Sequence, residues 1–98
     1  MVVHILSIVS GADTTQQGSA VFARLASEFA RADQVTVSFE GIHTATSSFV
    51  NASLVPLLDR MSFDDVKRRL RVVNSTRQIN EMIKTRLARE ASRSPIAA

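Results

Sequence analysis

Three short runs of apolar and β-branched residues divide the chain. Residues 2–9 are almost continuously apolar, residues 35–39 alternate between apolar and polar side chains, and residues 69–73 carry Leu and Val between arginines. Such runs predict β-strands, and each is followed by a Gly or an Asn that favours a turn. The chain is therefore expected to contain three strands or more.

The first of the intervening segments has apolar residues at helical spacing on one side and charged residues on the other. Ser19 is a good N-cap residue, so this helix is expected to begin there and to stop near Asp33. The preceding residues 12–18 are polar and include Gly18, which favours a loop.

Two further stretches have the spacing of amphipathic helices. Residues 49–61 form one, which must bend or restart at Pro56 because proline lacks the backbone N–H of a helical hydrogen bond. Ser62 is expected to cap a short helix after it, and residues 76–90 carry an apolar stripe that predicts the last helix.

Alternation of strands and helices favours right-handed crossovers and a mostly parallel sheet with helices packed against it. We expect a small α/β fold with a parallel or mixed sheet of three to four strands. Residues 1–91 would form a single domain and residues 92–98 a disordered tail. The first strand is a candidate edge strand, through which two copies could associate, and the oligomeric state stays open.

Composition narrows the classes of function. The 98 residues suffice for one hydrophobic core, and the absence of cysteine excludes disulfides, zinc ribbons and thiol catalysis. No apolar stretch is long enough to span a bilayer, and the first residues lack the basic flank and the cleavage site of a signal peptide. A cytoplasmic protein that makes no contact with a membrane is expected.

Charge is distributed unevenly around the net value of +3. Residues 1–59 hold two arginines and five acidic residues, whereas residues 60–98 hold ten Lys or Arg and four acidic residues. The densest basic run consists of Lys67, Arg68, Arg69 and Arg71. It could bind nucleic acid or another anion, but no aromatic residue lies among these cations to stack on a base, which favours a solvated face.

Catalytic and metal-binding patterns are missing from the sequence. His4 and His43 lie on different elements, and no spacing of carboxylates completes a metal site around them. His43 and Ser47 could be imagined as base and nucleophile, but the chain has neither a Gly-x-Ser-x-Gly elbow nor the Gly-Lys-Ser/Thr of a P-loop. We therefore expect no catalytic residue and no cofactor. An enzyme using Ser47 or Ser48 remains an alternative.

A family resemblance rests on residues 35–58. A strand is followed there by Gly41-Ile42 and then by Thr46-Ser47-Ser48 at the start of a helix. This order resembles the central segment of STAS domains, the family of anti-sigma-factor antagonists. The continuation from Ser48-Phe49 to Asn51, and the later strand that ends at Asn74, are similar to the STAS-like family of uncharacterised bacterial proteins.

The resemblance implies a non-catalytic regulatory module that binds another protein in signalling. Its partner would be a GHKL-type ATPase or kinase, or a regulator similar to an anti-sigma factor. Ser48 matches the family's phosphoacceptor, with Ser47 and Thr46 as the neighbouring candidates. The partner-binding residues implied by position are Thr44, Ser47, Ser48, Phe49 and Asn51.

Two interpretations of the hydroxyl cluster remain open. A phosphate on Ser48 would add about −1.5 to −2 charges and would change a partner-facing surface without melting the helix. Alternatively, Thr46, Ser47 and Ser48 simply cap the helix, as such residues usually do.

Overall fold

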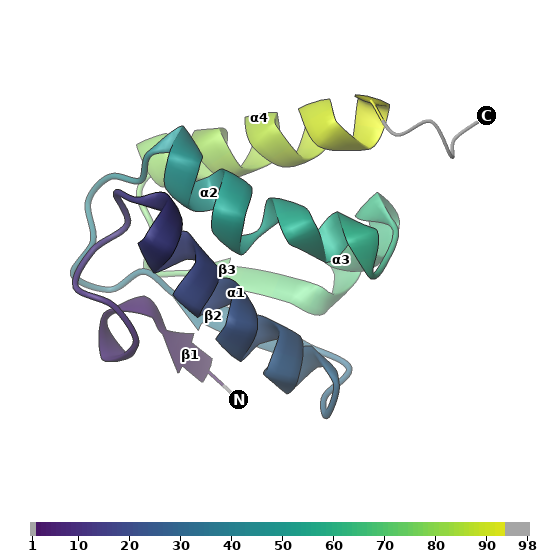
Figure 1. Cartoon of the computed structure of the whole chain (residues 1–98), viewed down its shortest axis with the longest axis horizontal. Helices are drawn as coiled ribbons and strands as arrows, with labels where there is room; N and C mark the ends of the chain where they lie inside the picture. The colour runs from purple at the N-terminus through teal and green to yellow at the C-terminus, as the bar shows by residue number, and fades with distance from the viewer. Residues whose placement is uncertain (1, 94–98) are drawn as a thin grey trace.

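The protein forms a small α/β fold, seen in a computed structural model that describes residues 2–93 (Figure 1). In chain order the elements are β1 (Val2–His4), η1 (Ile5–Ser7), α1 (Thr15–Phe29), β2 (Val35–Ser38), α2 (Ser47–Ser53), η2 (Val55–Asp59), α3 (Phe63–Arg69), β3 (Leu70–Val73) and α4 (Arg77–Arg93), where η denotes a 3-10 helix. The predicted alternation of strands and helices is confirmed.

The three strands form one sheet in the order β1-β2-β3, and both neighbouring pairs are parallel. In register, Val37 of β2 lies between Val3 of β1 and Val72 of β3. The parallel sheet and the edge position of the first strand agree with prediction. Within the described chain, β3 forms the opposite edge.

Helices cover one face of this sheet. Val3 and Val37 point to that face and are fully buried, whereas Val2, His4 and Arg71 alternate with them and are exposed. In Figure 1, α1 crosses in front of the strands and α2 lies beside α1. Alternate positions along the strands therefore face the core and the open side of the sheet, although Ser38, on the open side, is also buried.

The first helix begins earlier than predicted. Thr14 caps it, because the Thr14 hydroxyl accepts a hydrogen bond from the Gln17 backbone N–H (3.1 Å) and the Gln17 side chain accepts one from the Thr14 N–H (3.0 Å). This reciprocal capping box places Gly18 inside the helix and Ser19 on its exposed side. The predicted start at Ser19 is thus wrong, since polar residues form the first helical turn.

The first strand is shorter than predicted. After His4 the chain turns into the 3-10 helix η1, and the Ser7 hydroxyl donates to the His4 carbonyl oxygen (2.7 Å). Ile5 remains buried while Leu6 is 46% exposed. A continuous apolar run is thus divided between a strand and a turn, which periodicity alone does not distinguish.

The other helix boundaries follow the prediction closely. The chain leaves α2 at Ser53 and re-forms as η2 with Pro56 in its first turn, and the Ser62 hydroxyl accepts from the Asp65 backbone N–H (3.1 Å). The last helix continues to Arg93, past its predicted end. Residues 94–98 of the predicted tail lie outside the described residues.

The core lies between the sheet and the helices, and its largest fully buried side chains are Phe39, Phe49, Ile5, Leu25, Leu54, Leu57 and Ile79. One acid is buried beside it. Glu28 is 3% exposed and accepts hydrogen bonds from Arg24 (2.9 Å) and Arg31 (3.2 Å). The bond from Arg24 is the main cause of the lowered pKa of Glu28, so this carboxylate stays ionised at neutral pH.

Candidate functional site

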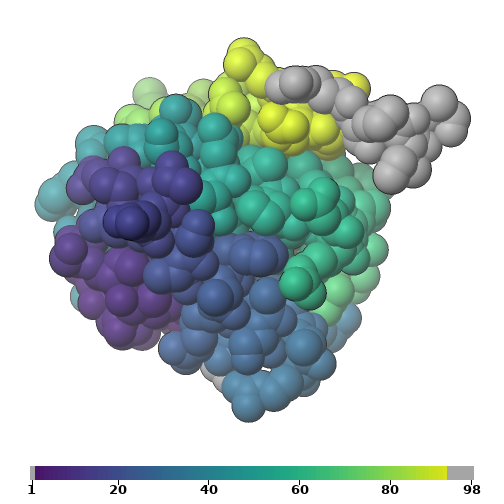
Figure 2. All heavy atoms as spheres, viewed as in Figure 1, coloured from purple at the N-terminus to yellow at the C-terminus, as the bar shows by residue number. Residues whose placement is uncertain are grey.

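The candidate site comprises the loop of residues 43–46 and the beginning of α2. Residues 12–13, just before α1, hold one side of this loop. The Thr46 backbone N–H donates to the Ala12 carbonyl oxygen (3.0 Å), and the Thr46 hydroxyl donates to the Asp13 carbonyl oxygen (2.8 Å). The beginnings of α1 and α2 are consequently neighbours on the surface, as Figure 2 shows.

The start of α4 holds the other side. The Gln78 side-chain amide donates to the Ala45 carbonyl oxygen (3.1 Å) and accepts from the Ala45 backbone N–H (3.0 Å). The Thr76 hydroxyl donates to the His43 carbonyl oxygen (2.9 Å). Neither Thr76 nor Gln78 can be identified from the sequence, because a polar side chain at the start of a helix does not indicate a partner that is distant in the chain.

Thr46 acts as the helix cap. Its hydroxyl accepts from the Phe49 backbone N–H (3.1 Å) while it donates to Asp13. The capping interpretation is therefore confirmed for this residue. Phosphorylation of Thr46 would remove the proton that its hydroxyl donates to the Asp13 carbonyl oxygen, whereas an ester or phosphate oxygen could still accept from the Phe49 backbone N–H.

Ser47 and Ser48 are placed differently. Both are exposed in the first turn of α2, and neither hydroxyl makes a hydrogen bond among the residues that the structure describes. Thr44 is exposed as well. It lies on the loop of residues 43–46, which we call the braced loop because hydrogen bonds hold it on both sides. Since Thr46 already supplies the cap, the two serine hydroxyls are not needed for it.

Phe49 requires a correction. Its ring is completely buried and makes an edge-to-face contact with Phe39, with the ring centroids 6.4 Å apart and the planes at 76°. It therefore belongs to the core and not to a partner-binding surface. Asn51 is exposed as expected, and its side-chain oxygen accepts from Arg86 Nε (2.9 Å), which connects α2 to α4.

The residues considered for catalysis and for metal binding can be placed in the described part of the chain. His43 is exposed, and no hydrogen bond joins it to Ser47 among residues 2–93. Within the same residues, no group of three or more metal-ligating side chains gathers. None of the helices described is long and apolar enough to cross a bilayer.

Two members of the basic run are occupied by contacts within the fold. Arg68 donates to Asp65 Oδ1 (3.0 Å), and this bond is the main cause of the lowered pKa of Asp65 and the raised pKa of Arg68. Arg69 donates to the carbonyl oxygens of Phe29, Ala32 and Asp33 (3.2, 3.3 and 2.7 Å) at the end of α1. These contacts reduce the charge that a nucleic acid could reach.

A pair of substitutions checks this assignment. Arg69→Met is expected to lower the free energy of unfolding by about 1–2 kcal/mol, because three carbonyl oxygens lose a charged donor. The exposed Arg71 is the matched control, and Arg71→Met should change stability by about 0.5 kcal/mol or less. Urea denaturation measures both values. Equal stabilities of the two variants would show that Arg69 is a surface cation like its neighbour.

Of the comparisons with known proteins, one gives a match. A family model described as a STAS-like domain of unknown function (DUF4325) matches residues 17–80, which include β2, the braced loop, α2, α3 and β3. No curated protein and no solved structure gives a significant match.

Proposed function

This chain belongs to the family of STAS-like domains of unknown function, and from that premise we propose that it is a non-catalytic regulatory module of the cytoplasm. Its proposed activity is to bind another protein through Thr44, Ser47, Ser48 and Asn51, together defined as the α2 surface. The proposed partner is a GHKL-type ATPase or kinase, or a regulator similar to an anti-sigma factor.

One observation supports this proposal most directly: two hydroxyl groups without hydrogen-bond partners among the described residues follow a loop that is held in place. Ser47 and Ser48 are exposed, while hydrogen bonds to the segment just before α1 and to the start of α4 fix the preceding loop. A surface held in one conformation loses little conformational entropy when a partner binds. The α2 surface is therefore pre-organised for recognition.

Phosphorylation is the proposed switch, with Ser48 as the acceptor and Ser47 as its neighbour. A phosphoryl group would add about −1.5 to −2 charges. Neither hydroxyl makes a hydrogen bond within the described chain that this change would break. The modification would therefore alter the surface presented to the partner and leave the core unchanged.

The experiment compares Ser48→Glu with Ser27→Glu, in which the same charge is added to an exposed serine of α1. We expect both variants to keep the wild-type free energy of unfolding within about 0.5 kcal/mol. Immobilised wild-type protein, Ser48→Ala and Ser27→Glu should retain a partner from cell extract that Ser48→Glu loses. The retained partner is then purified and titrated against each variant.

The outcomes separate a recognition surface from a simple helix end. Retention of every wild-type partner by Ser48→Glu, with unchanged affinity, would contradict the proposed surface. Equal loss by Ser48→Glu and Ser27→Glu would indicate a general effect of charge and would contradict it as well.

A further inference from the structure

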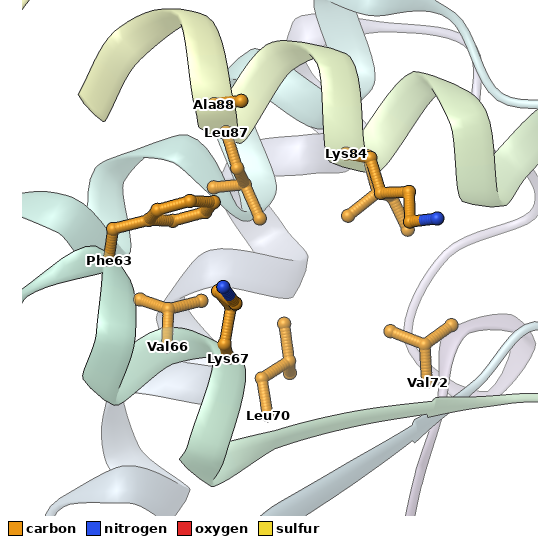
Figure 3. A pocket seen from close by; sticks show the side chains of 9 residues that line it. Phe63, Val66, Lys67, Leu70, Val72, Lys84, Leu87 and Ala88 are labelled. Carbon is orange, nitrogen blue, oxygen red and sulfur yellow. The ribbon is translucent and has the colours of Figure 1, made fainter. Parts of the chain in front are cut away.

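An apolar cavity of about 350 Å³ lies between α3, β3 and α4, and no residue of the α2 surface lines it. Its lining residues are Phe63, Val66, Lys67, Leu70, Val72, Ile83, Lys84, Leu87 and Ala88. Figure 3 shows the side chains of the two helices and of the strand converging on this space. We call it the β3 pocket.

The position of β3 explains why the pocket exists. As an edge strand in the described chain, β3 has a neighbour on one side only, and α4 crosses above it with Ile83 and Leu87. Leu70 and Val72 are consequently half-buried and not fully buried. Apolar surface left accessible in this way favours an apolar occupant that removes it from water.

Charge restricts the occupant further. Among the described residues that line the pocket, Lys67 and Lys84 are the polar ones, both are exposed, and none is acidic. Lys67 Nζ lies 5.2 Å from the centre of the Phe63 ring, whereas Lys84 stands on α4, on the Val72 side of the pocket in Figure 3. A complementary ligand therefore combines an apolar body with an anionic end.

We propose that the β3 pocket binds a single-chain aliphatic carboxylate, such as a medium-chain fatty acid. The alkyl chain lies against Leu70, Val72 and Leu87, and the carboxylate is paired with Lys67 or Lys84. The volume of about 350 Å³ lies at the lower end of the range of small-ligand pockets, about 300–1,000 Å³. This inference is independent of the proposed function of the α2 surface.

Titration with a series of carboxylates, followed by methyl NMR and calorimetry, tests the proposal. Decanoate, used below its micelle concentration, should shift the methyl signals of Val72 and Leu87. Affinity should rise from hexanoate to decanoate by up to about fourfold per methylene and then level off once the pocket is filled. Decanol, which lacks the charge, should bind more weakly than decanoate.

Variants locate the binding site. Lys67→Gln combined with Lys84→Gln should weaken decanoate binding by about 3–10-fold, because two exposed ion-pairing groups are lost. Arg71→Gln, in the same basic run but outside the lining, should leave the affinity unchanged. Ala88→Phe, an exposed position of the lining, should fill the entrance and abolish binding without altering the fold.

Three results would overturn the proposal. They are an absence of methyl shifts for every chain length, equal binding of decanol and decanoate, and an affinity that keeps rising with chain length and is insensitive to Ala88→Phe. The last result is the behaviour of non-specific adsorption.

Discussion

Replacing Phe49 by alanine is expected to lower the free energy of unfolding by about 3–5 kcal/mol. The ring is fully buried and packs edge-to-face on Phe39, the residue that follows β2. Its removal leaves a cavity that the surrounding backbone cannot close, since the braced loop and the cap of α2 fix the helix in place. Urea denaturation followed by circular dichroism measures the change.

Two controls separate this effect from the loss of an exposed apolar group. Phe49→Leu keeps most of the buried volume and should cost less than about 1.5 kcal/mol. Leu6→Ala removes a side chain that is 46% exposed and should cost clearly less than Phe49→Ala. If Phe49→Ala unfolds at the wild-type urea concentration, the ring is not part of the core and returns to the candidate partner surface.

The same prediction determines how partner binding should be tested. A loss of binding by Phe49→Ala would reflect unfolding, so this variant carries no information about a recognition surface. Ser48→Glu is informative because the Ser48 side chain is exposed and makes no hydrogen bond among the described residues. The spacing of apolar residues had already placed Phe49 in a helical stripe, and that local pattern predicted its burial better than the family resemblance predicted its role.

The sheet could be predicted because each strand is marked by a local run of apolar and β-branched residues in the sequence. Alternation in β2 follows from burial of one face, and Val35 and Val37 are indeed fully buried. The breaks at Pro56 and Ser62 were predictable for a similar reason, since each depends on the backbone chemistry of the residue itself.

The start of α1 could not be predicted in this way. Thr and Gln are common both in loops and in the first turn of a helix, and only the reciprocal bonds between Thr14 and Gln17 distinguish the two. The braces of the candidate site were hidden for a different reason. Gln78 is 33 residues away from Ala45 in the sequence, so their contact exists only once the fold brings α4 beside the loop.

Gly18 was expected in a loop but lies inside α1, where it contacts α2. Substituting it should have the second large effect on stability. A Cβ atom at this position would lie 2.6 Å from the Phe49 carbonyl oxygen and 2.7 Å from the Ala52 Cβ atom. Both neighbours belong to α2, so the two helices would have to separate. Gly18→Val is expected to lower the free energy of unfolding by about 3 kcal/mol or more.

Gly18→Ala gives the sharper test, because the two contributing effects have opposite signs. In an unobstructed helix, alanine is more stable than glycine by about 1 kcal/mol. At Gly18 the clash should outweigh this gain and give a net loss of about 1–3 kcal/mol. Gly11→Ala is the control, since its Cβ would meet only the ends of the flexible Asp13 and Gln17 side chains, and it should be nearly neutral. A stabilising Gly18→Ala would mean that α1 and α2 do not pack closely at this position.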